Sequence, residues 1–340
     1  MNWMKKRIAA LLAVVMVLSL AACGQDNQQE QQEEQPEVTP ASYSSAALKG
    51  PTAMGLVKLM SDAESGAELA NDYTFTLAAS ADEVTPSLIK GDLDMACVPA
   101  NLAAVLYQKT EGEIVTLAVN TLGVLYIVEN GNAVQSMADL AGKTIVASGK
   151  GSTPEYALRY LLQENGLDPD ADVVIDWKSE HSECVSALAT GAATIAMLPQ
   201  PFVTVAQSKI PDLRVALDLT KEWDALDNGS ALLTGVIVAR KEVVEENPAA
   251  VDAFLQEYAA SVEWVNGNTA DAAALIGDYG IVEAAVAEKA LPYCNIVCVT
   301  GSEMKEMLSG YLQVLFDADP ASVGTDAEGS LPGDDFYYGA

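Results

Sequence analysis

The residues best suited to ligand binding form a glycine-rich loop, Gly-Lys-Gly-Ser-Thr, from Gly149 to Thr153. Its glycines allow the backbone to approach a ligand closely. The loop leads into an expected helix, and a helix N-terminus presents free N–H groups and the positive end of its dipole to an anion. Ser152 and Thr153 add hydroxyls and Lys150 adds charge, so we expect all three to contact the ligand. The alternative is that Ser152 only caps the helix, in a capping box with Glu155, and that Lys150 points to solvent.

Three further loops follow apolar segments that read as strands: 50–55, 99–101 and 199–201. In parallel α/β sheets, ligands bind beyond the carboxyl ends of the strands. These loops and a neighbouring segment that crosses between lobes therefore supply the other expected ligand contacts, which are Thr52, Met54, Asn101, Thr121 and Gln200.

Aromatic residues are scarce, so their positions carry information. Trp223 is placed in a polar loop after a strand, where its ring could stack on a ligand, and we expect it to be a further contact. Trp177 and Tyr126 are weaker candidates, and a structural role is the alternative for each. The single histidine, His181, is expected on the surface at the start of a helix. One histidine supports neither a catalytic triad nor a zinc site, so we expect no enzyme activity, cofactor or metal.

The elements that would position these loops appear twice in the chain, about one hundred residues apart. The matching landmarks are Gly91 and Gly191, Met95–Pro99 and Ile195–Pro199, Asp72 and Asp172, and the loops near 50 and 150. So long a period indicates a duplicated lobe, and two facing lobes form a cleft where small molecules bind. The alternative is that any two α/β segments share glycine and proline at their turns.

Both halves alternate strand and helix patterns, which predicts mainly parallel sheets flanked by helices. Two apolar segments interrupted by glycine, 119–128 and 232–240, are expected to cross between the lobes and act as a hinge. Lobe one is therefore expected to be discontinuous, formed by residues 44–122 and 236–340, with lobe two at 123–235. The later part of the chain is expected to be helical over 251–265, 271–279 and 304–316.

The first residues are typical of a targeting signal. A basic start and an apolar run predict a signal peptide over residues 1–22, ending in Leu20-Ala21-Ala22 before Cys23. This order resembles a bacterial lipobox, which implies lipidation of Cys23. The alternative is an ordinary signal peptide with an incidental cysteine. Residues 23–43 are rich in Gln and Glu, so we expect a disordered tether that holds the protein at the outer face of the bacterial cell membrane.

Charge and cysteine content narrow the function classes. The formal net charge is −30, which argues against nucleic acid binding because phosphate contacts need clustered Lys and Arg. Four cysteines follow the lipobox, namely Cys97, Cys184, Cys294 and Cys298. Their spacing favours free thiols, with a Cys294–Cys298 bridge as the alternative.

Several of these segments together resemble the substrate-binding lipoproteins of bacterial ABC importers. The resemblance rests on the lipobox, the tether, the run Gly142–Glu155, the start Leu48–Thr52, the segment 295–304 and the end Leu331–Tyr338. The branch is similar to the NMT1/THI5-like and nitrate/sulfonate/bicarbonate group. The resemblance implies a two-lobed, type II periplasmic-binding-protein-like fold. It also implies a monomer that delivers a small polar ligand, such as a sulfonate, nitrate or a pyrimidine- or vitamin-like molecule, to an ABC permease with a cytoplasmic ATPase.

Two other functions stay open at this point. Some members of the resembling group are enzymes that make a pyrimidine precursor with a histidine and a cysteine-rich motif. This chain lacks such a cluster, which disfavours that function. A lipid-anchored sensor or scavenger domain without a transporter is the other alternative.

Overall fold

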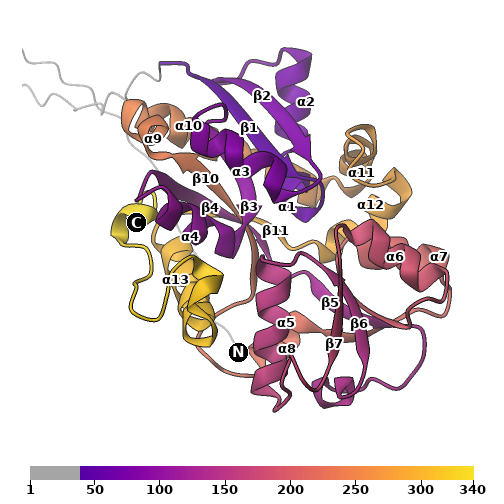
Figure 1. Cartoon of the computed structure of the whole chain (residues 1–340). Coiled ribbons are helices and arrows are strands. Elements are labelled where there is room, and N and C mark those ends of the chain that lie inside the picture. The colour runs from indigo at the N-terminus through magenta and orange to yellow at the C-terminus, as the bar shows by residue number, and fades with distance from the viewer. Residues whose placement is uncertain (1–38) are drawn as a thin grey trace, which may run out of the picture. The chain divides into compact units, whose positions relative to one another are not determined.

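The computed structural model describes residues 39–340, which form one compact unit. The expected signal peptide, Cys23 and most of the expected tether lie outside the described residues. The chain forms two sheets, and Figure 1 shows how helices flank them. The first sheet consists of β1 (Ser42–Leu48), β2 (Asp72–Ala78), β3 (Met95–Pro99), β4 (Ile114–Leu122), β10 (Leu233–Arg240) and β11 (Ile296–Val299). The second consists of β5 (Leu125–Glu129), β6 (Thr144–Ser148), β7 (Val174–Lys178), β8 (Ile195–Pro199) and β9 (Arg214–Asp218).

The two sheets share one strand order over five strands, and β11 of the first sheet has no counterpart in the second. The first runs β11-β4-β10-β3-β1-β2, and the second, from the opposite edge, runs β9-β5-β8-β6-β7. In each, a central strand pairs in parallel with two neighbours: β1 with β2 and β3, and β6 with β7 and β8. In each, one antiparallel strand, β10 or β5, lies beside them. The hundred-residue sequence repeat therefore corresponds to two sheets of matching topology.

Helices cover both faces of each sheet. Those of the first sheet are α1 (Pro51–Met54), α2 (Val57–Ser65), α3 (Ala81–Lys90), α4 (Ala100–Lys109), α9 (Lys241–Glu246), α10 (Pro248–Gly267) and α13 (Gly301–Ala318). With them we group α11 (Thr269–Asp278) and α12 (Ala284–Ala290), of which α11 packs on α2 and α10 and α12 packs on α11. Those against the second are α5 (Thr153–Glu164), α6 (His181–Ala189), α7 (Phe202–Lys209) and α8 (Leu219–Asp224). Short 3-10 turns lie at Met137–Leu140, Leu291–Tyr293, Pro320–Val323 and Asp334–Phe336.

We call the first sheet with its helices lobe one, and the second sheet with its helices lobe two. One apolar cluster runs through both lobes. It contains Val98 and Leu312 from lobe one together with Ile127 and Leu158 from lobe two. Each lobe also has its own cluster on its other face, beneath α10 in lobe one and beneath α6 and α7 in lobe two. The core is thus continuous from lobe to lobe.

Several boundaries differ from the sequence expectation. β1 begins at Ser42, inside the range expected for the tether, because residues 42–48 pair in register with 72–78 of β2. Helices α8 and α12 and strand β11 were not expected, since each is only four to seven residues long and carries too little periodicity. The four described cysteines are free, and Cys294 and Cys298 form no bridge. No helix within residues 39–340 is long and apolar enough to span a membrane.

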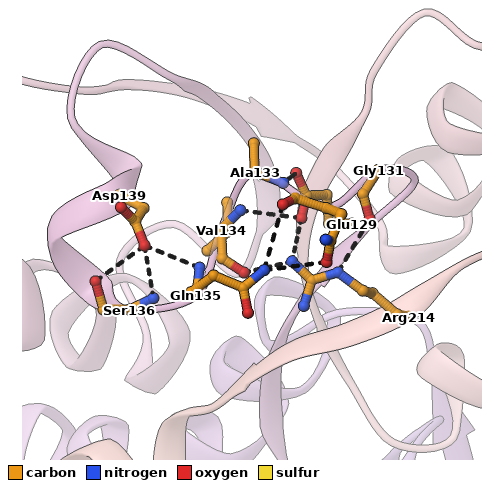
Figure 2. Close-up of polar contacts among 9 residues, drawn as sticks. Glu129, Gly131, Ala133, Val134, Gln135, Ser136, Asp139 and Arg214 are labelled. Atoms are coloured by element: carbon orange, nitrogen blue, oxygen red, sulfur yellow. Dashed lines mark hydrogen bonds and ion pairs between the residues drawn. The ribbon is translucent and has the colours of Figure 1, made fainter.

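Figure 2 shows a buried carboxylate, that of Glu129, and its hydrogen-bond partners in lobe two. Because β5 is antiparallel to β8, Glu129 lies beside the start of β8, away from the carboxyl ends of the parallel strands. Glu129, at the end of β5, is 3% exposed. Its carboxylate accepts hydrogen bonds from the backbone N–H groups of Ala133 (2.9 Å) and Val134 (3.1 Å), and from the Arg214 guanidinium of β9 (2.5 Å). Arg214 also donates to the Gly131 carbonyl at 3.0 Å. The ion pair therefore ties the β5–β9 edge to the turn that follows β5.

Candidate functional site

The glycine-rich loop leads into α5 as expected, but its hydrogen bonds differ from a capping box. The Ser152 hydroxyl donates to the Gly149 carbonyl at 2.8 Å instead of capping α5. The Glu155 carboxylate accepts from the Gly151 N–H at 2.6 Å. Gly149 and Gly151 both have left-handed backbone angles (φ 86° and 76°), and this turn brings the Gly149 carbonyl within reach of Ser152. The alternative interpretation of Ser152, a capping box with Glu155, is therefore wrong. Lys150 is exposed, as its alternative interpretation held.

Thr153 and Asn101 come together although they belong to different lobes. Thr153 is the first residue of α5, and Asn101 lies in the first turn of α4. The Thr153 hydroxyl donates to Asn101 Oδ1 at 3.4 Å and accepts from the Tyr311 hydroxyl of α13 at 3.3 Å. All three residues are fully buried. Sequence reasoning missed Tyr311, because its place in an expected helix gives no sign of what its hydroxyl meets.

Thr52 and Thr121 also lie close together, beside the strands that cross between the lobes. The Thr52 hydroxyl donates to the Leu48 carbonyl at 3.2 Å, and the Thr52 carbonyl accepts from Asn120 Nδ2 at 3.3 Å. The Thr121 hydroxyl in turn donates to Asn120 Oδ1 at 3.0 Å. A Cβ at Gly235 of β10 would lie 2.5 Å from Thr52 Cγ2, so β10 packs directly against this group. Asn120, which was not expected, is its central member.

The other expected contacts lie in three different settings. Met54 is fully buried in the core of lobe one, and Gln200 Oε1 accepts from the Thr204 hydroxyl at 2.9 Å. Trp223 is not in a polar loop: it lies in α8 and is fully buried. Its ring packs against Tyr160 and Tyr311, with centroids 4.8 and 5.6 Å away. The polar residues next to Trp223 in the sequence gave no sign of this burial, because α8 turns only Leu219 and Trp223 into the core.

His181 is partly exposed, and its side chain also makes two internal contacts that were not expected. It is the first residue of α6, and its Nδ1 lies 2.5 Å from the hydroxyl of Ser148, the last residue of β6. Its ring packs against Phe202, with centroids 4.9 Å apart. Burial lowers the pKa of His181 to about 4, so its imidazole is neutral at neutral pH. Ser148 can donate to Nδ1 of the neutral ring, which leaves Nε2 as an N–H donor.

Two hollows in the described surface lie apart from most of these residues. One of about 140 Å³ lies between α5 and α13 and is lined by Tyr156, Arg159 and Asp319, among others. The other, of about 330 Å³, lies between residues 224–231 and α13.

Polar side chains thus gather where the parallel strands of each lobe end: Thr52 and Asn101 in lobe one, and Ser148, His181 and Gln200 in lobe two.

The family model "ABC transporter, phosphonate, periplasmic substrate-binding protein" matches residues 66–290. The chain belongs to this family. It is the extracytoplasmic substrate-binding component of an ABC importer, whose partners are a small-molecule ligand and a permease. No curated protein matched the chain in a sequence search.

Solved structures of binding proteins share the fold. An ABC transporter protein from Parabacteroides distasonis aligns with a TM-score of 0.72 and 22% identity, over 87% of this chain and 98% of that one. The periplasmic aliphatic sulphonate binding protein SsuA from Escherichia coli aligns with a TM-score of 0.68 and 16% identity, over 84% and 94%. The alkanesulfonate-binding protein SsuA from Xanthomonas axonopodis, bound to MOPS, gives 0.65 and 16%, over 85% and 95%. The expected type II periplasmic-binding-protein-like fold is thereby confirmed.

Proposed function

We propose that this protein captures a small oxyanion, of the phosphonate or sulfonate type, between its two lobes and is held at the membrane by a lipid on Cys23. The observation that carries the proposal is the set of uncharged polar side chains at the carboxyl ends of β1, β6 and β8, within a family of phosphonate-binding transport proteins. The NMT1/THI5-like branch, with nitrate or a pyrimidine-like ligand, is the neighbouring possibility within the same fold.

The chemistry of these groups favours an anion bound by hydrogen bonds. The N-terminus of α5 supplies the positive end of a helix dipole beside Ser152. His181 Nε2–H, held by the Ser148 contact, is a second donor. The exposed Lys150, in the loop that leads into α5, adds a positive charge. A tetrahedral oxyanion has several acceptor oxygens that such converging donors can satisfy together.

A thermal-shift screen tests the ligand class. Methylphosphonate, methanesulfonate, nitrate and a hydroxymethylpyrimidine are added separately to the purified full-length protein. A ligand present at 100 times its Kd should stabilise the fold by about 2.7 kcal/mol, because it binds the folded state only. We expect the phosphonate or sulfonate to raise the melting temperature and His181→Ala to abolish that rise. A response to the pyrimidine alone would overturn the oxyanion proposal.

The lipid anchor needs its own test. Cells that express the wild-type chain or Cys23→Ser are labelled with a radioactive fatty acid and fractionated. We expect label and membrane association for the wild type, and neither for the variant. Equal membrane recovery of both chains would argue that Cys23 is incidental.

A further inference from the structure

A buried chain of hydrogen bonds, which we call the relay, passes from lobe one to lobe two and back. Its members are Tyr311, Thr153, Asn101 and Ser322. The Tyr311 hydroxyl donates to Thr153 Oγ1 at 3.3 Å, and Thr153 donates to Asn101 Oδ1 at 3.4 Å. Asn101 Nδ2 then donates to the Ser322 carbonyl at 3.0 Å. The four residues are at most 1% exposed. Thr153 alone belongs to lobe two, so it is the only member that lobe opening would separate from the rest.

The direction of these bonds determines what Thr153 can do. A hydroxyl has one hydrogen to donate, and in this arrangement Thr153 gives it to Asn101. Its oxygen already accepts from Tyr311. The side chain is therefore committed to lobe one, and a ligand near α5 would meet Ser152 and the backbone of the loop instead. This assigns Thr153 and Asn101, both expected as ligand contacts, a different part in binding.

Apolar packing seals the same contact. Trp223 of lobe two is fully buried, and its ring lies 5.6 Å from that of Tyr311. If the lobes separated, the hydroxyls of Tyr311 and Thr153 would need new partners, and the Trp223 ring would meet water. Water can replace the hydrogen bonds, so each is worth only a modest factor in the equilibrium.

We propose that Tyr311 and Asn101 are positioning residues, which hold the Thr153 hydroxyl across the lobes and so favour the closed arrangement before any ligand binds. The proposal rests on the proposed function, in which the lobes close on a ligand. A protein whose closed state is already populated binds more tightly, because its apparent Kd is the intrinsic Kd divided by the competent fraction. Losing one net hydrogen bond should change that fraction by roughly two- to tenfold.

Two variants and a matched control test the relay without any ligand. Tyr311→Phe and Thr153→Val each remove one hydroxyl from the relay and keep the side-chain shape. Tyr258→Phe is the control, because Tyr258 is also fully buried but its hydroxyl donates within lobe one, to the Val297 carbonyl at 3.3 Å. Acrylamide quenching of tryptophan fluorescence reports lobe opening, with Trp223→Phe identifying the signal of Trp223.

We expect both relay variants to make Trp223 more accessible to acrylamide and Tyr258→Phe to leave it unchanged. Quenching equal to wild type in both relay variants would overturn the proposal. If Tyr311→Phe fails to fold, Thr153→Val decides the question alone, since its change lies on the other lobe.

A second arm connects the relay to binding. Titration calorimetry with methylphosphonate should show roughly two- to tenfold weaker binding for both relay variants than for wild type and Tyr258→Phe. The double variant should bind no more weakly than Thr153→Val alone, because that change already removes both bonds of the Thr153 hydroxyl. Unchanged affinity alongside increased quenching would refute the link to binding. If the wild type binds no oxyanion, the proposed ligand class fails while the quenching arm still judges the relay.

Discussion

At the scale of single residues, burial sets the chemistry of the region where the strands of lobe two end. His181 was expected on the surface and is only partly exposed, because it contacts Ser148 and Phe202, and desolvation lowers its pKa to about 4. The same environment raises the pKa of the Cys184 thiol to about 11, chiefly through burial. At neutral pH both side chains are therefore uncharged. These two side chains should therefore contribute little pH dependence to binding between pH 6 and 8.

The lowered pKa of His181 predicts a loss of stability in acid. The pKa of a histidine in the unfolded chain is near 6.5. Between pH 6.5 and 4, His181 is therefore protonated in the unfolded chain but neutral in the folded chain. Stability is complete above pH 6.5 and falls as the pH drops towards 4. We expect at most about 2 kcal/mol of this loss between pH 7 and pH 5. Urea unfolding at both pH values should show that the unfolding free energy of His181→Gln falls less between pH 7 and pH 5 than that of the wild type. An equal fall in both proteins would contradict the assignment to His181.

The buried Glu129 predicts a second residue-scale effect. Burial alone would raise its pKa, but the hydrogen bonds from Ala133, Val134 and Arg214 outweigh burial and lower it. Glu129→Gln leaves the Arg214 charge without its partner, so we expect a loss of roughly 2–4 kcal/mol of unfolding free energy. Asp170→Asn is the control: the Asp170 side chain that pairs with Arg159 is 72% exposed, so we expect its replacement to cost much less than that of the buried Glu129. Similar midpoints in denaturant for the two variants would refute the distinction.

At the scale of elements, the crossing strands are built for close packing. Gly235 of β10 lies against Thr52 and Asn120, and Gly123, between β4 and β5, lies against Thr220. Any side chain on either glycine would collide with these neighbours. The crossing segments therefore need glycine for space, and the hinge region tolerates little change in its packing.

Gly235→Ala tests this packing. The added Cβ would lie 2.5 Å from Thr52 Cγ2 and 2.6 Å from Asn120 Oδ1, so we expect a loss of roughly 1–3 kcal/mol. Gly267→Ala, at the end of α10, meets no atom within 4 Å and should be neutral or stabilising by up to about 1 kcal/mol. Chemical unfolding of both variants measures the difference, and an equal effect would show that close approach is not the cause.

Elements with strong local patterns could be predicted from the sequence, whereas those that depend on tertiary contact could not. The apolar run 95–98 and its echo 195–198 are β3 and β8, and Pro154 marks the start of α5 within one residue. The rule that ligands bind at strand ends selected Thr52, which does lie beside Asn120 and Thr121 of the crossing segment. His181 and Tyr311 were missed, because only the folded chain brings Ser148 and Thr153 to them.

At the scale of the whole molecule, the shared apolar cluster joins the lobes into one folding unit. Residues as distant as Val98 and Leu158 belong to the same core, although they lie in different sheets. Separating the lobes completely would expose this surface to water, at about 25 cal/mol for each Å². Lobe opening is therefore expected to be limited in extent.

The shared core predicts a single unfolding transition. Differential scanning calorimetry of the full-length protein should give one peak, with a calorimetric enthalpy close to the van't Hoff value. Ligand should move that peak to higher temperature without splitting it. Two resolved peaks, only one of which shifts with ligand, would show that the lobes unfold separately.

Strand β4 pairs with strands that are synthesised later, and this sets the order in which the two sheets can form during translation. Every strand of the second sheet lies within residues 125–218, so that sheet has all its partners once this stretch has emerged. Strand β4, made earlier, waits for β10 and β11, and Thr116 pairs with Tyr337 close to the last residue. During translation the second sheet can therefore form completely while the first sheet still lacks strands. Its earliest apolar strands depend on its latest residues for cover, and that interval is when it is most exposed to aggregation.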